Sequence, residues 1–173
     1  MKLKKFNFKT VNSTNDLAIQ IIKKTNNKSG IIIAEKQKKG RGQYGKKWTS
    51  FKGNLFVSIF FKINKVQLSL KDLTKVNCLL VKKLLSKFYN GKIIIKKPND
   101  LLINKMKISG ILQEILIKSG EKFIVVGVGI NFTKSLFKRN GVHPDLYVRS
   151  RRQRQMCIRD RQYTPYKIAL LIF

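Results

Sequence analysis

The sequence predicts an α+β domain in which helices lie on one side of a mostly antiparallel sheet. Two segments carry apolar residues at helical spacing, and several others have the apolar, β-branched composition of strands. The later strand segments are joined by short turns, at Asn104 and Lys105 and at residues 119–122. Such turns join antiparallel neighbours, because a parallel connection needs a crossover of about a dozen or more residues. With 173 residues, the chain can bury one core without disulfides or metals.

The first half of the chain contains one predicted helix, two strands and a glycine-rich loop. Residues 13–16 are Ser-Thr-Asn-Asp, which are helix-capping residue types, and apolar residues follow at helical spacing. A helix is therefore expected over residues 15–24. Residues 30–35 and 54–62 read as strands, and the loop of residues 40–48 lies between them.

The second half contains a long helix followed by short strands. Apolar residues recur every three or four positions over residues 70–88, which predicts an amphipathic helix. Pro98 ends the strand after this helix, because proline has no amide hydrogen for the sheet, and Asn99 and Asp100 favour a turn. The strands expected here span residues 92–97, 101–103, 107–117 and 123–130.

Composition limits the cellular setting. The net charge of +30 suggests nucleic-acid binding, but the lysines are scattered along the chain, and Lys, Ile, Asn and Phe are enriched together. We favour the codon usage of an AT-rich genome as the explanation. Cys78 and Cys157 lie far apart, and no signal peptide or membrane-length apolar run is visible. A cytoplasmic protein without membrane contact is expected.

The composition changes abruptly at residue 150. Residues 150–161 contain no lysine, and residues 151–161 contain five arginines in a string that resembles a translated sequencing adapter. We therefore expect a catalytic domain over residues 1–149, with an incomplete C-terminal part, followed by a non-native tail over residues 150–173. The alternative is an arginine-rich arm that binds RNA. His143, the only histidine, lies near this doubtful region.

The loop of residues 40–48 has the composition of an anion-binding site. It reads Gly-Arg-Gly-Gln-Tyr-Gly-Lys-Lys-Trp. Glycines expose their amide groups, and Arg41 can pair with phosphate or carboxylate. It is not a P-loop, since Lys47 replaces the required Ser or Thr and a strand follows. The pair Gly127 and Gly129 lacks the third glycine of a dinucleotide-binding fingerprint. After these exclusions, the loop still fits chemistry in which cations and backbone amides stabilise phosphate charge.

Four segments carry a combined pattern: Ser13-Thr14-Asn15, residues 40–48, Lys97-Pro98-Asn99-Asp100 with Lys107 and Gly110-Ile111-Leu112, and Gly127-Val128-Gly129-Ile130-Asn131. Taken in this order, they resemble the biotin–protein ligases, specifically the catalytic domain of biotin–[acetyl-CoA-carboxylase] ligase. The resemblance runs from about residue 8 to residue 132 and implies a fold like that of the class II aminoacyl-tRNA synthetases. It also implies a two-step reaction: biotin and MgATP give biotinyl-5′-AMP, and biotin then passes to a lysine of biotin carboxyl carrier protein.

The resemblance implies roles for individual residues. Lys107 and Arg41 would be catalytic, because their cations offset the repulsion between a carboxylate and a phosphate. The biotin-binding residues would be Ser13, Thr14, Asn15, Gln37, Arg41, Gly42, Gln43, Lys107 and Gly110. The ATP- or adenylate-binding residues would be Arg41, Trp48, Asn99, Asp100 and Asn131. No metal ligands within the chain are expected, and Mg²⁺ would accompany ATP.

Structural alternatives exist for several of these residues. Residues 13–15 could simply cap a helix, and Trp48 could be a hydrophobic anchor. Asn99 and Asp100 could only form a turn, and Asn131 could only end a strand. Glu114 is either a partner of a binding residue or an ordinary strand residue.

Two positions depart from the pattern of the family. Lys97 stands where tryptophan is usual, and Gln43 stands where arginine is frequent, so weaker packing and looser retention of the intermediate are expected. The pattern begins near Met1, so we expect a monofunctional ligase without specific DNA binding. A homodimer through a sheet edge is left open. The alternatives are a lipoate or octanoyl transferase of the same fold and a basic nucleic-acid-binding module.

Overall fold

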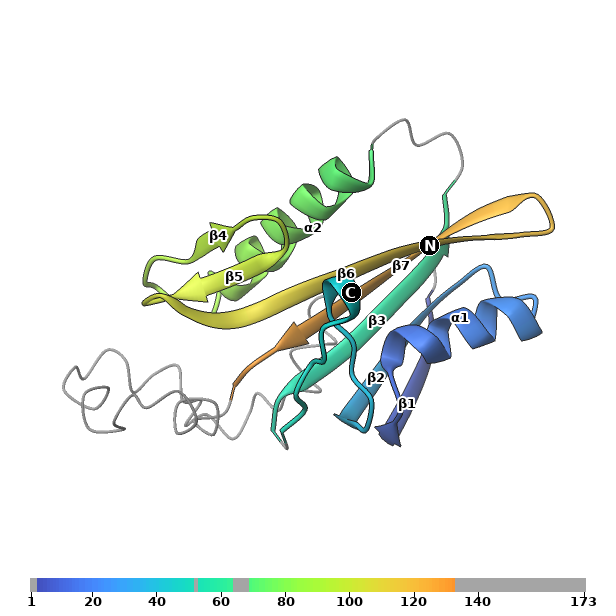
Figure 1. Cartoon of the computed structure of the whole chain (residues 1–173), viewed down its shortest axis with the longest axis horizontal. Helices are drawn as coiled ribbons and strands as arrows, with labels where there is room; N and C mark the ends of the chain where they lie inside the picture. The colour runs from blue at the N-terminus through green and yellow to red at the C-terminus, as the bar shows by residue number, and fades with distance from the viewer. Residues whose placement is uncertain (1–2, 52, 64–68, 133–173) are drawn as a thin grey trace.

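The computed structural model describes residues 3–51, 53–63 and 69–132, which form one sheet with two α-helices (Figure 1). The seven strands lie in the order β1-β2-β3-β7-β6-β5-β4. The elements are β1 (Lys4–Val11), α1 (Thr14–Lys24), β2 (Ser29–Gln37), the 3₁₀ turn η1 (Gln43–Gly45), β3 (Leu55–Lys62), α2 (Leu70–Leu85), β4 (Ile94–Lys96), β5 (Asp100–Ile103), β6 (Met106–Lys118) and β7 (Glu121–Ile130).

The α+β class and the mostly antiparallel sheet are confirmed. Within the described residues, β1 pairs with β2 in parallel, and every other pairing in the sheet is antiparallel. The parallel pair follows from α1, which carries the chain from the end of β1 back to the start of β2. The sheet is therefore mixed, with its parallel pair at one edge.

The expected placement of the helices on one side is wrong, because α1 and α2 pack on opposite faces. Neighbouring residues of β2 show this: Ile32 belongs to the core under α1, whereas Ile31 and Ile33 belong to the core under α2. Side chains alternate between the faces of a strand, so both faces of the central strands are apolar. Each face then needs a helix to cover it.

Serine caps begin both helices. Ser13 Oγ accepts a hydrogen bond from the Asp16 amide at 3.3 Å, and Ser69 Oγ accepts one from the Asp72 amide at 3.1 Å. Each bond satisfies an amide that has no partner within the helix. The predicted start of α1 is thus correct to within one residue. α2 ends at Leu85, three residues before the predicted end.

Strand β1 was not predicted. It lies at the edge of the sheet, and Val11 is its only buried residue. An edge strand with exposed side chains lacks the apolar alternation that identifies a half-buried strand.

Other expectations concern parts of the chain outside the described residues. These are the boundary at residue 149, the tail over residues 150–173, His143 and Cys157. Within the part that the structure describes, no helix has the length and apolarity needed to span a membrane.

Candidate active site

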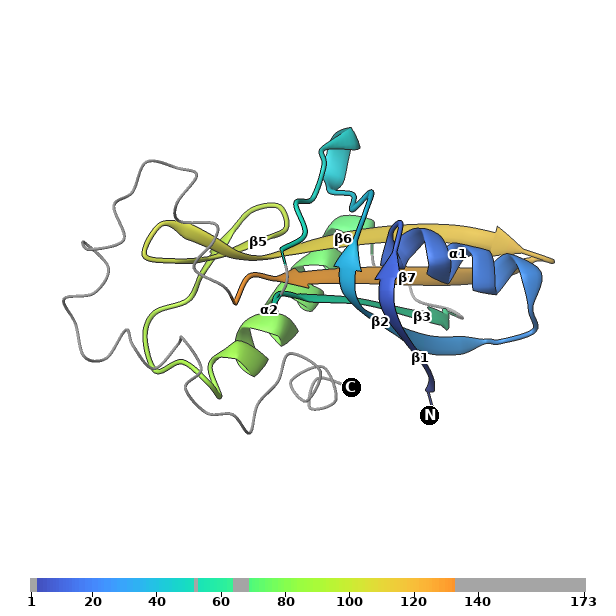
Figure 2. The same ribbon diagram turned by 90° about the horizontal axis from the view of Figure 1, so that it is seen from below.

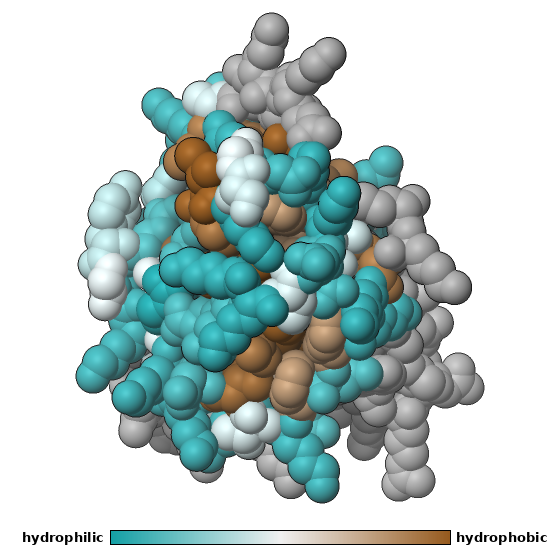
Figure 3. Space-filling model, turned by 90° about the vertical axis from the view of Figure 1, so that its right-hand side faces the viewer, coloured by the Kyte–Doolittle hydropathy of each residue, from teal (hydrophilic) through white to brown (hydrophobic). Residues whose placement is uncertain are grey.

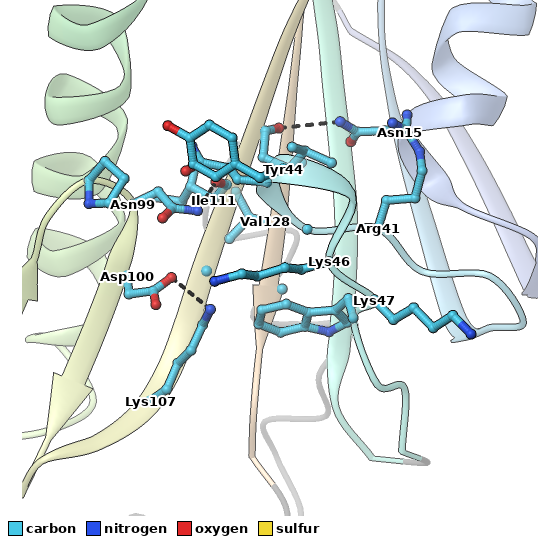
Figure 4. Close-up of a pocket in the computed structure, with 18 of the residues that line it drawn as sticks. Asn15, Arg41, Tyr44, Lys46, Lys47, Asn99, Asp100, Lys107, Ile111 and Val128 are labelled. Carbon is cyan, nitrogen blue, oxygen red and sulfur yellow. Dashed lines mark hydrogen bonds and ion pairs between the residues drawn. The ribbon is translucent and has the colours of Figure 1, made fainter.

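A cavity of about 340 Å³ opens on the face of the sheet that carries α1 (Figure 4). Its walls come from the start of α1, the loop of residues 40–48, the turn before β5, and strands β6 and β7. The loop stands out from the sheet, as Figure 2 shows at η1. All but one of the predicted site residues line this cavity: Ser13, Thr14, Asn15, Gln37, Arg41, Gly42, Gln43, Trp48, Asn99, Asp100, Lys107 and Gly110. The exception is Asn131.

The floor of the cavity exists because one face of β7 changes from large residues to glycine. On this face, Phe123 and Val125 pack under α1, and Gly127 and Gly129 come next. A Cβ on Gly127 would lie 2.2 Å from Asn15 Oδ1, and one on Gly129 would lie 2.5 Å from Trp48 Cζ2. The glycines therefore leave room for these two side chains to lie against the sheet.

The inner wall is a buried polar network. The Thr14 amide and Thr14 Oγ1 both donate to Gln37 Oε1, at 2.8 and 3.1 Å. Ser58 Oγ lies 2.7 Å from Thr14 Oγ1 and 2.5 Å from Asn15 Oδ1. Asn15 Nδ2 donates to the Leu112 carbonyl at 3.2 Å. Fixed amides and hydroxyls of this kind can present donors and acceptors to a polar ligand.

Trp48 forms a flat side of the cavity. Its ring lies against Gly110 and Gly129, which are directly paired across β6 and β7. A Cβ on Gly110 would lie 2.6 Å from Trp48 Cζ3. The indole Nε1 is buried without a hydrogen-bond partner among the described residues. Trp48 thus offers an aromatic surface on which an apolar or planar ligand can pack.

Lys107 places its ammonium beside this aromatic wall. Lys107 Nζ lies 5.0 Å from the centroid of the Trp48 ring and 2.7 Å from Asp100 Oδ1. The Lys107 side chain is 41% exposed, so an incoming anion can reach it. Lys46 extends toward the same region, whereas Lys47 points away (Figure 4). The site can therefore bring cations to an anion that packs against Trp48.

Arg41 is held against the inner wall by two carboxylates. Its Nη2 lies 2.9 Å from each oxygen of Glu114 and 2.6 Å from Asp16 Oδ1. Burial of the guanidinium lowers the pKa of Arg41, but the hydrogen bond to Glu114 and the charges of Glu114 and Asp16 outweigh it and raise the pKa. The loop itself is a small hairpin, in which the Trp48 amide donates to the Gly40 carbonyl at 2.9 Å.

Asn99 and Asn131 both bond to the backbone. Asn99 Nδ2 donates to the Ile111 carbonyl at 2.8 Å, which ties the turn after β4 to β6. Asn131 Nδ2 donates to the Lys107 carbonyl at 3.2 Å, outside the cavity lining. Asn131 thus supports the strand segment that carries Lys107, and its predicted contact with adenosine stays a prediction.

Sequence reasoning missed several residues of this site. Ser58 is fully buried within the apolar strand β3, and a lone serine in such a strand was a usable signal. Tyr44 and Lys46 line the cavity from the loop, but nothing in their spacing singled them out. Asp16 was also missed, because its contact with Arg41 joins distant segments. Glu114 was not missed: of the two alternatives for it, its bonds to Arg41 and Asn15 favour the partner of a binding residue.

Cys78 lies under the turn that carries Asn99 and should be unreactive in the folded protein. Burial, together with the charge of Asp100, raises the pKa of the Cys78 thiol to about 11. At pH 8, about 0.1% of the thiol would then be ionised, and the thiolate is the reactive form. Iodoacetamide at pH 8 should leave Cys78 unmodified until denaturant is added, and labelling should increase as the pH rises toward 11. Peptide mass spectrometry measures this, and rapid labelling of the native protein would contradict the described burial.

Comparison with known proteins agrees with the geometry. Residues 7–131 match the sequence model of the Biotin/lipoate A/B protein ligase family. The chain belongs to this family. Among curated members, the bifunctional ligase/repressor BirA of Escherichia coli is 37% identical over 124 residues, which cover 70% of this chain and 38% of that protein. The biotin–[acetyl-CoA-carboxylase] ligase of Paracoccus denitrificans is 30% identical over 106 residues, which cover 60% of this chain and 44% of that protein.

Solved structures of the biotin/lipoate ligase family have the same fold. The biotin protein ligase of Aquifex aeolicus, in complex with biotin and ATP, superposes with a TM-score of 0.70 at 25% identity and covers 98% of this chain and 66% of that chain. The biotin acetyl coenzyme A carboxylase synthetase of Helicobacter pylori, with bound biotinylated ATP, gives 0.67 at 25% identity and covers 78% and 63%. The chain spans about two fifths of the length of the curated relatives described above.

Proposed function

We propose that this chain is the catalytic domain of a biotin–protein ligase that uses MgATP. The supporting observation is that one cavity joins the polar wall at Thr14, Asn15 and Gln37 to the Trp48 surface and the Lys107 ammonium. Such a cavity suits a small molecule with a polar ring at one end and a carboxylate at the other. Relatives named as biotin ligases, and structures named as complexes with biotin and ATP, support the same assignment.

In the first proposed step, a carboxylate oxygen of biotin attacks the α-phosphorus of ATP. A new P–O bond forms, the bond to the β-phosphate oxygen breaks, and pyrophosphate leaves with its electron pair. Both reactants are anions, so Lys107 would lower the barrier by lying between them. Trp48 would exclude water from one side of the mixed anhydride, biotinyl-5′-AMP.

In the second proposed step, an uncharged lysine amine of biotin carboxyl carrier protein attacks the acyl carbon. An amide forms, the acyl–phosphate bond breaks and AMP leaves, while the amine loses a proton to solvent. The cavity is open to solvent where Lys107 is exposed, so an incoming lysine can approach there. This step needs no nucleophile from the chain itself.

Magnesium would enter as part of the substrate MgATP. Mg²⁺ is usually held by one or two carboxylates together with phosphate oxygens and water. Of the described residues that line the cavity, Asp100 supplies the one carboxylate, so the donor set fits a metal held mainly by the triphosphate. The metal would neutralise charge on the phosphates, and Asp100 would also keep Lys107 in place.

The proposal extends to partners and setting. Strand β1 presents an exposed sheet edge, and either the carrier protein or a second copy of this chain could pair with it. Some relatives are named as repressors, but the matched region is 38% of the Escherichia coli protein. We assign ligase activity, without specific DNA binding, to the region described here, and we place it in the cytoplasm.

A nucleic-acid-binding module is the less favoured alternative. Stacking platforms for single strands need aromatic side chains on a basic surface. Among the described residues, Phe8 and Tyr44 are the exposed aromatics, and they lie on β1 and on the loop. The face in Figure 3 is largely hydrophilic, with smaller hydrophobic areas between the polar side chains. The described surface therefore does not have the arrangement of aromatic side chains that stacking of nucleotide bases needs.

Pyrophosphate release from ATP tests the proposed function. The protein should release pyrophosphate when biotin is present and should not when biotin is omitted or replaced by lipoate or octanoate. Adding a biotin carboxyl carrier domain should then give biotinylated carrier, detected by mass spectrometry. Turnover with lipoate in place of biotin would instead support the alternative, a lipoate or octanoyl transferase of the same fold. Pyrophosphate release that does not depend on biotin, lipoate or octanoate would reject the assignment. Salt-sensitive RNA binding without turnover would also reject it.

A further inference from the structure

Glu114 joins the loop of residues 40–48 to the inner wall of the cavity. Its two carboxylate oxygens each lie 2.9 Å from Arg41 Nη2, and its Oε2 accepts a hydrogen bond from Asn15 Nδ2 at 2.7 Å. The side chain is 26% exposed, so these bonds are only partly screened by water. One carboxylate on β6 therefore contacts both a loop residue and a wall residue that are separated from it by many positions in the chain.

Asp16 supplies a second contact to the same guanidinium. Its Oδ1 lies 2.6 Å from Arg41 Nη2, and it follows Asn15 directly in the first turn of α1. Arg41 is thus held between two carboxylates that come from different elements. The Asp16 side chain is 41% exposed, and of these two carboxylates it is Glu114 that hydrogen-bonds the Asn15 side chain. Glu114 is therefore the member that couples Arg41 to the wall.

The orientation of the Asn15 amide depends on the same contact. Asn15 Oδ1 lies against Ser58 Oγ, and Nδ2 is shared between Glu114 and the Leu112 carbonyl. Without Glu114, the nitrogen keeps only the longer of its two bonds, at 3.2 Å. A buried amide that loses a charged partner also loses its fixed orientation.

We propose that Glu114 is a positioning residue for ligand binding, with Asp16 as a weaker second anchor. It holds the Arg41 guanidinium near the cavity and fixes the Asn15 amide, so that the wall and the loop are already arranged when the small acid arrives. This proposal rests on the proposed function for the identity of the acid. Its contact with the loop can be tested without any ligand.

The test compares Glu114→Ala and Glu114→Gln with Glu35→Ala, which removes an exposed glutamate of β2 outside the cavity lining. Trp48 is the only tryptophan in the chain, so its fluorescence reports biotin binding without ATP. Pyrophosphate release gives separate KM values for biotin and ATP. Limited trypsin digestion, mapped by mass spectrometry, measures cleavage after Arg41, Lys46 and Lys47 in the ligand-free protein.

Glu114→Ala should weaken biotin binding about tenfold and raise KM for biotin by a similar factor. KM for ATP should rise less, because Lys107 and Trp48 do not depend on Glu114 for their positions. Glu114→Gln keeps an acceptor and should recover part of this loss. Trypsin should cut the loop faster in Glu114→Ala than in wild type or Glu35→Ala. Asp16→Asn, which removes a contact to Arg41 alone, should weaken binding about threefold and also expose the loop.

Three results would overturn the proposal. The first is a Glu114→Ala variant that matches Glu35→Ala in binding and proteolysis. The second is an equal loss in every kinetic parameter together with a lowered melting temperature and no recovery in Glu114→Gln. The third applies if Glu114→Ala does not fold: it is an Asp16→Asn variant whose biotin binding and trypsin cleavage are the same as in wild type. A wild type that neither binds biotin nor releases pyrophosphate rejects the proposed function instead, and the trypsin comparison still tests the contact between Glu114 and Arg41.

Discussion

Lys107→Ala is expected to lower biotin-dependent pyrophosphate release at least about 100-fold. The variant removes the ammonium that lies beside Trp48 and that would separate the two reacting anions. Its ion pair with Asp100 is partly exposed, so the free energy of unfolding should change by no more than about 1 kcal/mol. Stopped assays with radiolabelled ATP measure the first quantity, and urea denaturation measures the second.

Lys122→Ala is the matched control for this substitution. Lys122 is an exposed lysine at the far end of β7, outside the cavity lining. In a chain with a net charge of +30, loss of one lysine also weakens general attraction for ATP. A drop in Lys107→Ala that Lys122→Ala reproduces would therefore show a general charge effect. Full activity in Lys107→Ala would exclude Lys107 from the chemistry.

The parts of the fold that the sequence predicts are those with a local signal. The cap at residues 13–16, the apolar strands and the tight turns all depend on neighbouring residues, and the structure confirms these elements. The sequence could not show which face of the sheet each helix covers, because β2, β3 and β7 are apolar on both faces. Edge strand β1 has too few buried residues to be recognised.

In the site too, residues with an informative type and order could be predicted, whereas contacts between residues far apart in the sequence could not. The glycine-rich loop, Lys107 and the polar residues 13–15 were found because their residue types and order are informative, and the structure brings them together around one cavity. The partners of Arg41 could not be predicted, since Glu114 lies 73 positions away in sequence. Asn99 and Asn131 show that the side chain of a polar residue in a motif can hydrogen-bond a backbone carbonyl.

Gly127→Ala is expected to abolish measurable biotin binding at concentrations that saturate the wild type. The residue lies in a regular strand, so the backbone tolerates alanine, and the effect comes from space alone. The new Cβ would lie 2.2 Å from Asn15 Oδ1 and 3.0 Å from Asn15 Cγ, well inside contact distance. Asn15 cannot move aside without losing its bonds to Ser58, Leu112 and Glu114. The variant should also lose about 1–3 kcal/mol of stability, as overpacked sites usually do.

Gly30→Ala separates the loss of binding from the loss of stability. Its Cβ would lie 2.7 Å from the Phe60 ring, in the core under α1 and away from the cavity lining, so it should destabilise the fold to a similar extent. Trp48 fluorescence measures biotin binding in both variants, and urea denaturation measures their stability. Equal binding in the two variants at equal stability would show that the Asn15 position is not needed for recognition. Loss in Gly127→Ala alone would mean that glycine on this face of β7 is required because the Asn15 amide occupies the space where a side chain would be.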